Sequence, residues 1–314
     1  MTGAVASLSV RYSGFGPASV LRVVPGSVAA PAAGQVRIAV HAAGLNPSDS
    51  KMREGLMPRL VPMFPAGTGR EVAGVIDAVG ETVTEFSVGD AVFGSVSGGA
   101  IAEFVLAKPG SLASRPEGLD WTAAATLPLA GITAWDSFSS QEVTENDTVL
   151  VSAAGGGVGV LVAQLALRAG ATVIGTAGER NHAFLRELGA IPVTYGPGLA
   201  DRVRAAAAGK PITVVFDHHG DETIEAGLEL GVPAARINTI AVDAAAHGVQ
   251  GVGRGPVNRQ TLETLAGLVV AGELRVPIDS VFQLADVVAA YDRLDGGHVL
   301  GKVVVTVGPE SAGE

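Results

Sequence analysis

The chain has 314 residues, 47% of them hydrophobic, and a formal net charge of −10, and this length suggests about two domains of roughly 150 residues each. Negative charge without a basic stripe argues against a nucleic-acid partner, and no apolar run reaches the roughly 18–20 residues of a membrane span. Because no N-terminal signal pattern is present, we expect a cytoplasmic protein that binds neither nucleic acid nor membrane. The chain contains no cysteine, which rules out disulfides, thiolate metal sites and cysteine nucleophiles. Its six histidines have no H-x-x-x-H or H-E-x-x-H spacing, so we expect no metal site.

Residues 1–120 are rich in short segments in which apolar and polar residues alternate. Residues 35–42 alternate the apolar Val36, Ile38 and Val40 with more polar positions, as a half-buried strand does. Residues 72–80, 90–94 and 102–106 are further strand candidates. Several short strands at this spacing predict a compact, mostly antiparallel barrel.

From about Trp121 the pattern changes to strands that alternate with helices. Strands are predicted at residues 148–152, 172–176, 213–216 and 236–241, and helices at 158–168, 181–188 and 222–230. This alternation indicates parallel strands joined by crossover helices. Beyond residue 255 we predict a helix at 260–271 and a last strand at 303–307.

The most informative segment is a short buried strand that runs into the glycine-rich turn AAGGGVG at 153–159. The spacing Ala153-x-x-Gly156-x-x-Gly159 is related to the dinucleotide-binding fingerprint. Glycines let the backbone approach a pyrophosphate, and the following helix offers N–H groups and a positive dipole end. The alternative is a structural turn without a ligand, but the strand at 172–176 completes a strand–turn–helix–strand unit that favours a nucleotide. The residues expected at the pyrophosphate are Ala154, Gly155, Gly156, Gly157, Val158 and Gly159.

Five segments match one family in order: AGLNPSD at 43–49, GREVAGV at 69–75, LPLAGITAW at 127–135, the glycine turn, and GH-x-x-GK at 297–302. On these motifs the chain resembles the zinc-independent quinone oxidoreductases (zeta-crystallin-like) of the medium-chain dehydrogenase/reductase superfamily. The resemblance implies an α/β protein with a GroES-like β-barrel catalytic domain at 1–120. A Rossmann domain with a doubly wound parallel sheet would bind NADPH at 121–255, and residues 256–314 would return to the catalytic domain. It also implies an active cleft between the domains and a homodimer joined along the Rossmann sheet edge.

Zinc-dependent relatives carry Cys and His where this chain resembles them at Asn46 and Arg70. Without those ligands zinc cannot polarise an alkoxide. The resemblance therefore implies acceptors that take a hydride without a metal, namely quinones, enones and similar conjugated carbonyls.

The end of the second predicted Rossmann strand bears on the choice between NADPH and NADH. Glu179 can act as the ribose-binding carboxylate of an NAD site, Arg180 can pair with the 2′-phosphate of NADPH, and a solvated Glu–Arg pair is the third interpretation. Family members hold that phosphate with a similar small-x-Arg-Asn run and with a tyrosine at the position of Tyr195, which favours NADPH. The resemblance also places Thr133 at the nicotinamide end of the cofactor. The other expected cofactor-binding residues are Thr176, Gly178, Asn181, Asp217, Ile240 and Lys302.

Candidate catalytic residues come from two regions. In relatives the loop that matches Asn46 and Asp49 faces the nicotinamide, so Asn46 can donate to a carbonyl oxygen; Asp49 either orders the loop or is a local turn carboxylate. Lys51 stands about where relatives often have a tyrosine, and is either a proton donor or positive charge for an enolate, or an ordinary surface lysine. His218 and His219 follow a strand at the carboxyl edge of the predicted sheet, where ligands bind. They are either acid–base groups or one packed and one solvated side chain.

We therefore predict an NADPH-dependent enzyme that transfers a hydride to a small quinone or enone, a class that includes tailoring enzymes of secondary metabolism. Two alternatives stay open. One is non-redox chemistry on the same scaffold, such as a cyclisation that uses His218 or His219, and the other is an NADPH-binding sensor.

Overall fold

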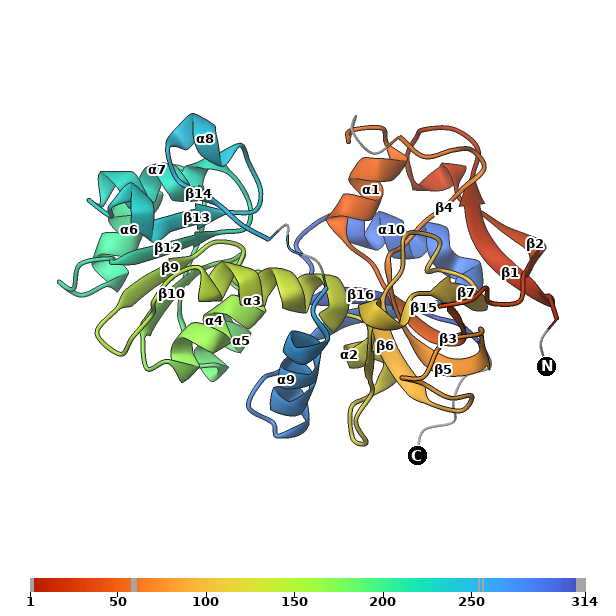
Figure 1. The fold of residues 1–314 in the computed structure, drawn as a ribbon. Helices are drawn as coiled ribbons and strands as arrows, with labels where there is room; N and C mark the ends of the chain where they lie inside the picture. The colour runs from red at the N-terminus through yellow and green to blue at the C-terminus, as the bar shows by residue number, and fades with distance from the viewer. Residues whose placement is uncertain (1–2, 58–60, 254, 256, 309–314) are drawn as a thin grey trace. The chain divides into compact units, whose positions relative to one another are not determined.

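The computed structural model describes residues 3–57, 61–253, 255 and 257–308. The chain forms two compact units (Figure 1). The first unit consists of Met1–Leu129, Val257–Glu273 and Pro277–Glu314, and the second of Ala130–Pro256 and Leu274–Val276. The sequence placed the corresponding boundaries after residues 120 and 255. The predicted fold class is confirmed, since one unit is largely antiparallel and the other is a parallel sheet with helices.

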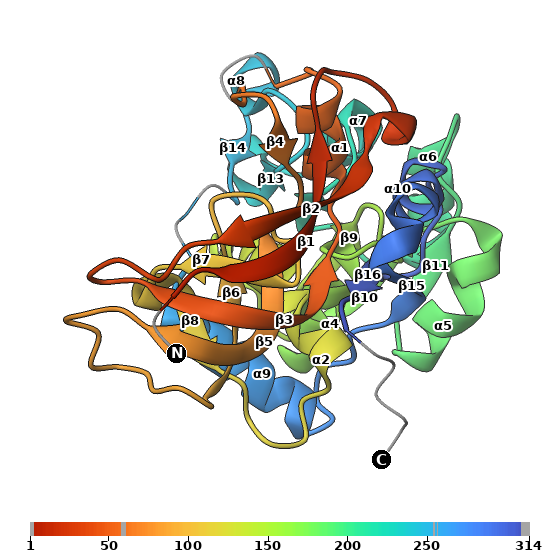
Figure 2. The ribbon, with the colours of Figure 1, turned by 90° about the vertical axis from the view of Figure 1, so that its right-hand side faces the viewer.

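The first unit contains a seven-stranded sheet of order β15-β16-β3-β5-β6-β8, with β7 paired to β3, and a three-stranded sheet of order β2-β1-β4. The bounds are β1 (Val5–Tyr12), β2 (Arg22–Val28), β3 (Val36–Gly44), β4 (Ala66–Gly67), β5 (Glu71–Val79), β6 (Ala91–Ser95), β7 (Phe104–Ala107), β8 (Leu112–Ser114), β15 (Ile278–Gln283) and β16 (Lys302–Thr306). β1 and β2 lie side by side, as do β3 and β5 (Figure 2). Val36, Ile38 and Val40 of β3 are buried in the core, as their alternation predicted. β16 pairs antiparallel with β3, so the C-terminal segment returns to the first unit.

The helices of the first unit are α1 (Pro47–Arg53), α2 (Trp121–Ala124), α9 (Arg259–Val270) and α10 (Val287–Asp295), with short turns η1 (Ala18–Val20), η2 (Pro109–Ser111) and η6 (Leu284–Asp286). α1 begins at Pro47 because proline suits the first helical position and because the Asn46 N–H donates to Asp49 Oδ2 at 3.0 Å. Asp295 of α10 accepts hydrogen bonds from Ser50 and Arg53. These contacts fix α1, and with it the segment that precedes it.

The second unit contains a six-stranded parallel sheet of order β11-β10-β9-β12-β13-β14. The strands are β9 (Thr148–Val151), β10 (Thr172–Thr176), β11 (Ile191–Val193), β12 (Val214–Asp217), β13 (Ile237–Thr239) and β14 (Gln250–Gly251). The helices are α3 (Ile132–Ser139), α4 (Gly159–Arg168), α5 (His182–Glu187), α6 (Leu199–Ala206), α7 (Asp221–Glu229) and α8 (Ala244–His247), with η3 (Leu127–Gly131) at the unit boundary, η4 (Glu179–Asn181) and η5 (Ala234–Arg236). α3, α4 and α5 lie on one face of the sheet, and α6 and α7 on the other (Figure 1).

The strand order reverses between β9 and β12, which makes their carboxyl ends the switch point where ligands bind in such sheets. None of the described helices combines the length and the apolar composition that crossing a membrane requires.

Candidate active site

The glycine turn lies where β9 ends and α4 begins. The Ala153 N–H donates to Thr176 Oγ1 at 3.1 Å, and the Ala154 N–H donates to the Thr176 carbonyl at 2.8 Å. A Cβ at Gly159 would come within 2.3 Å of the Ala153 carbonyl oxygen, and one at Gly156 within 3.2 Å of the same atom. Glycine therefore lets α4 start directly against the turn. The residues present thus fit a dinucleotide, since this close approach would leave the N-terminus of α4 open to a pyrophosphate.

Of the residues predicted to hold the 2′-phosphate, Gly178, Arg180 and Asn181 follow β10, and Tyr195 follows β11. A Cβ at Gly178 would lie 3.9 Å from the hydroxyl oxygen of Tyr195, so glycine leaves space beside that ring. Tyr195 is 43% exposed, and Arg180 is exposed as well. Asn181 is buried, and a Cβ added at Gly155 would lie 2.8 Å from Asn181 Nδ2. The structure therefore brings Gly178 and Tyr195 together, keeps Arg180 accessible, and packs Asn181 against the glycine turn.

Asp217 connects the carboxyl ends of three parallel strands. Its carboxylate accepts from Ser152 Oγ at 2.9 Å and from Thr239 Oγ1 at 2.6 Å. It also accepts from the backbone N–H groups of His219 and Gly220, each at 3.1 Å. Asp217 is completely buried. Its contacts are those of a residue that holds the switch point in shape, whereas the sequence suggested a contact with the cofactor.

His218 belongs to a hydrogen-bond network within the second unit. Its N–H donates to Ser152 Oγ at 2.7 Å, and its Nε2 lies 3.0 Å from Ser137 Oγ. Ser137 Oγ also contacts Asn238 Oδ1 at 3.2 Å. Burial lowers the pKa of His218 to about 4, so the ring is neutral near pH 7 and has no proton to give as a general acid. His219 is exposed, so the two histidines differ in environment.

Thr133, expected at the nicotinamide end, and Ile240, another expected cofactor-binding residue, are neighbours in the structure. Both lie against Gly253, where a Cβ would come within 3.0 Å of the Thr133 methyl and 2.9 Å of Ile240 Cγ2. Gly253 has a φ of +75°, which favours glycine. The segment at Gly253 therefore requires glycine for two reasons: a side chain would collide with Thr133 and Ile240, and the backbone has a positive φ.

In the first unit Asn46, Glu71 and Lys302 form a buried network. Lys302 Nζ donates to Glu71 Oε1 at 2.6 Å, to Asn46 Oδ1 at 2.6 Å and to the Leu45 carbonyl at 2.7 Å. Asn46 Nδ2 donates to Glu71 Oε1 at 2.8 Å, and the Leu129 N–H donates to Glu71 Oε2 at 2.8 Å. An ammonium group has three donors, and all three are used here. Lys302, which the sequence suggested as a cofactor ligand, therefore has no donor left for one.

Asp49 lies beside this network. Its Oδ2 accepts from the Asn46 N–H at 3.0 Å, and its Oδ1 accepts from Arg70 Nε at 3.4 Å, while Arg70 Nη2 donates to Ser48 Oγ. Burial raises the pKa of Asp49 to about 6, an effect that the Arg70 charge opposes. These contacts suit a residue that orders the loop. Lys51, on the same helix, is exposed and forms no hydrogen bond or ion pair through its side chain with the residues that the structure describes.

Glu71, Ser137 and Asn238 were not predicted to belong to a functional site. Glu71 had a signal, because it is a carboxylate at the start of a mostly apolar strand, and a buried carboxylate needs a partner. Ser137 and Asn238 had none. They are common polar residues 101 positions apart, and only the fold brings them together.

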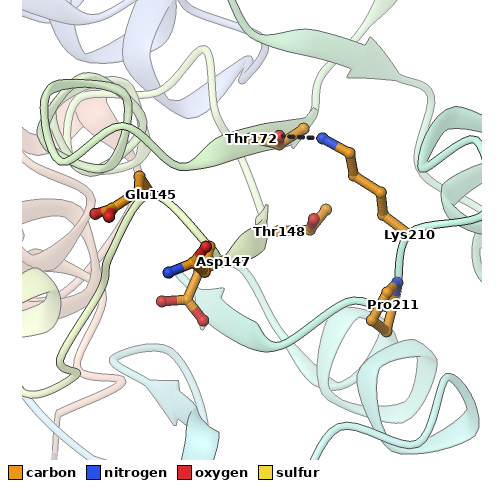
Figure 3. Close-up of a pocket in the computed structure, with 7 residues that line it drawn as sticks. Glu145, Asp147, Thr148, Thr172, Lys210 and Pro211 are labelled. Carbon is orange, nitrogen blue, oxygen red and sulfur yellow. Dashed lines mark hydrogen bonds between the residues drawn. The ribbon is translucent and has the colours of Figure 1, made fainter.

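No group of three or more His, Cys, Asp or Glu side chains among the described residues is arranged to hold a metal ion. A polar pocket lies at the amino ends of β9 and β10 (Figure 3). It is lined by Glu145, Asn146, Asp147, Thr148, Thr172, Lys210 and Pro211. The glycine turn follows the opposite end of β9, so this pocket is separate from the glycine turn.

Two family models match the chain: alcohol dehydrogenase GroES-like domain at residues 32–117, and zinc-binding dehydrogenase at residues 188–305. The quinone oxidoreductase of Pseudomonas aeruginosa is 31% identical, over 94% of this chain and 98% of its own length. The structure of the quinone oxidoreductase from Coxiella burnetii has a TM-score of 0.87 at 32% identity and covers 97% of this chain and 100% of its own. The structure of CurK enoyl reductase has a TM-score of 0.85 at 26% identity and covers 96% of this chain and 99% of its own. The chain therefore belongs to the zinc-independent quinone oxidoreductase family of the medium-chain dehydrogenase/reductase superfamily, as its motifs predicted.

Proposed function

We propose that the protein is an NADPH-dependent oxidoreductase that transfers a hydride, without zinc, to a quinone or an α,β-unsaturated carbonyl. The observation that carries the proposal is the nucleotide cradle of the second unit, where close-packed glycines at the start of α4 are followed by Gly178, Arg180 and Tyr195. The planar guanidinium of arginine pairs with a phosphate through two N–H donors. The exposed Arg180 beside the gap at Gly178 therefore favours the 2′-phosphate of NADPH.

Bound NADPH supplies the hydride in this proposal, and the residues of the first unit orient the acceptor. Asn46 Nδ2 has two N–H donors, of which one goes to Glu71. The other donates to the acceptor carbonyl oxygen, where negative charge develops. Lys302 holds the oxygen end of the Asn46 amide and Glu71 holds its nitrogen end, so the amide cannot turn its donor away.

The relatives support both acceptor classes. The Pseudomonas aeruginosa and Coxiella burnetii proteins are named quinone oxidoreductases, and CurK is named an enoyl reductase. The neutral, hydrogen-bonded His218 does not favour a non-redox reaction that would need an imidazolium at neutral pH. A homodimer joined along the Rossmann sheet edge, at the strand predicted at 236–241 or at its neighbour, stays a prediction, which sedimentation equilibrium would check.

The test is the oxidation of NADPH and NADH, followed at 340 nm, against a panel of quinones and enones. We expect turnover with NADPH preferred. Arg180→Gln should raise the KM for NADPH about 10- to 100-fold, as the loss of a hydrogen bond to a charged group does, and leave the KM for NADH nearly unchanged. Arg186→Gln, an exposed arginine of α5, is the matched control. A preference for NADH would refute the assigned role of Arg180, and tight NADPH binding without oxidation by any acceptor would favour a sensor instead.

A further inference from the structure

Among the charged side chains of Asp49, Arg70, Glu71 and Lys302, which we call the first-unit cluster, the side chain of Arg70 is the most exposed to solvent. Its side chain is 26% exposed, whereas those of Asp49, Glu71 and Lys302 are 2%, 0% and 5% exposed. Glu71 and Lys302 neutralise each other inside the protein. Any charge that this cluster presents to a bound molecule therefore comes from Arg70.

The guanidinium of Arg70 is oriented but not saturated. It has five N–H donors, of which Nε serves Asp49 and one on Nη2 serves Ser48. The other three have no protein partner among the described residues. Their nitrogen atoms are not among the buried atoms that lack a hydrogen-bond partner, whereas Arg53 Nη1 is such an atom. They therefore face solvent or a ligand. Two fixed contacts hold the group in place, which is the preorganisation that electrostatic catalysis needs.

Arg70 also lies next to the proposed acceptor-binding amide. Gly44 at the end of β3 pairs with Glu71 at the start of β5, so Asn46 and Arg70 both lie just beyond this end of the ladder. Asp49 accepts from the Asn46 N–H and from Arg70 Nε at the same time. A single carboxylate thus contacts both the backbone of Asn46, whose side-chain amide donates to Glu71, and the guanidinium of Arg70.

We propose that Arg70 is a catalytic residue that donates to the acceptor oxygen on which negative charge develops. This inference rests on the proposed function. The hydride of NADPH forms a C–H bond at the β-carbon of an enone, the C=C electron pair shifts, and the C=O pair moves onto oxygen to give an enolate. With a quinone, the same two electrons give a quinol monoanion. A proton from water then completes either product, while NADPH becomes NADP⁺.

The turnover test compares Arg70→Met, Arg70→Lys and Arg70→Ala with Arg22→Met. Arg22 is an exposed arginine of the same unit, and its guanidinium donates to the backbone carbonyls of Ser19 and Leu21. We expect Arg70→Met to lower kcat about 100- to 1000-fold, as the loss of one oxyanion donor does, and Arg70→Lys to lower it less. Free guanidinium should restore part of the activity of Arg70→Ala, which a purely structural role would not allow. NADPH affinity and the Arg22→Met rate should stay at wild-type values. An Arg70→Met kcat within threefold of wild type would overturn the proposal.

A binding test works even without turnover. The probe is 4-nitrophenolate, an aromatic oxyanion whose absorbance reports its ionisation, added to the protein with NADP⁺. We expect the wild type to bind it at least tenfold more tightly than Arg70→Met does, and to stabilise the anionic form. The double variant Asp49→Asn/Arg70→Met removes the carboxylate that Arg70 neutralises, and should bind as weakly if the fold is intact. Equal binding by wild type and Arg70→Met would refute the role of Arg70, whereas discrimination without any NADPH oxidation would refute only the proposed function.

Discussion

Replacing Lys302 by methionine tests the buried network of the first unit most directly. The carboxylate of Glu71 is completely buried, and its charged partner is the ammonium of Lys302 at 2.6 Å. Lys302→Met leaves that carboxylate with only the neutral donors of Asn46 and Leu129. Removal of one partner of a buried ion pair costs about 3–5 kcal/mol, because the remaining charge stays desolvated and uncompensated. We expect a loss of that size in the free energy of unfolding of the first unit.

The double variant Glu71→Gln/Lys302→Met supplies the second half of this prediction. It removes both charges while glutamine keeps an acceptor for the Asn46 amide and the Leu129 N–H. Buried pairs replaced by neutral groups of similar volume are often close to neutral in stability. The double variant should therefore recover more than half of the stability that Lys302→Met loses.

The assay uses the two tryptophans of the chain. Trp121 lies in the first unit and Trp135 in the second, so a Trp135→Phe background reports urea unfolding of the first unit through Trp121 alone. The affinity for NADPH is measured by nicotinamide fluorescence and should change less than twofold. A stability loss below about 1 kcal/mol, the range of exposed ion pairs, would refute the reasoning. Loss of NADPH binding with unchanged stability would instead restore Lys302 as a cofactor ligand.

Three further predictions follow from the same geometry. Gly159→Ala places a methyl group within 2.3 Å of the Ala153 carbonyl oxygen, so α4 must shift and the Kd for NADPH should rise at least tenfold. The control is Gly267→Ala, where a Cβ meets nothing within 4 Å. Equal Kd values for the two variants would contradict the proposal that the glycine turn binds NADPH. Because burial raises the pKa of Asp49 from 3.8 to about 6, its contribution to stability is complete below about pH 4 and is lost as the pH rises through 6. Relative to wild type, Asp49→Asn should therefore gain about 2 kcal/mol in the free energy of urea unfolding between pH 4 and pH 8, and a flat difference would refute the shift. Because burial lowers the pKa of His218 to about 4, its contribution is present above pH 6.5 and is lost as the pH falls toward 4; its ring protons should titrate below pH 5 by NMR, and a midpoint near 6.5 would contradict the burial.

Much of the fold was predictable because its signals are local. The alternation at Val36, Ile38 and Val40 predicted β3, since side chains of a strand point to opposite faces with a period of two. The predicted helix at 158–168 appears as α4 (Gly159–Arg168). It was predictable because its apolar run directly follows the glycine turn. α1, α3 and α6 were not predicted. None is longer than eight residues, so each has only about two turns in which to show an apolar period, whereas the short α5 was predicted at 181–188.

What the sequence determined by itself is the identity of the scaffold, and it also predicted the place of the nucleotide. The glycine turn and the two strands around it form one contiguous stretch, and the five motifs follow one another in a fixed order. The glycines can therefore be recognised from their spacing along the chain, because a close approach of the backbone to a ligand requires them. The tertiary structure alone decided which charged side chains pair with one another and which of them stay charged. Glu71 and Lys302 are 231 positions apart, and Ser137 and His218 are 81 apart. Whether a lysine binds a cofactor or neutralises a buried carboxylate, and whether a histidine is charged, depends on which groups surround it after folding, because burial and nearby charges set both its pKa and its free donors.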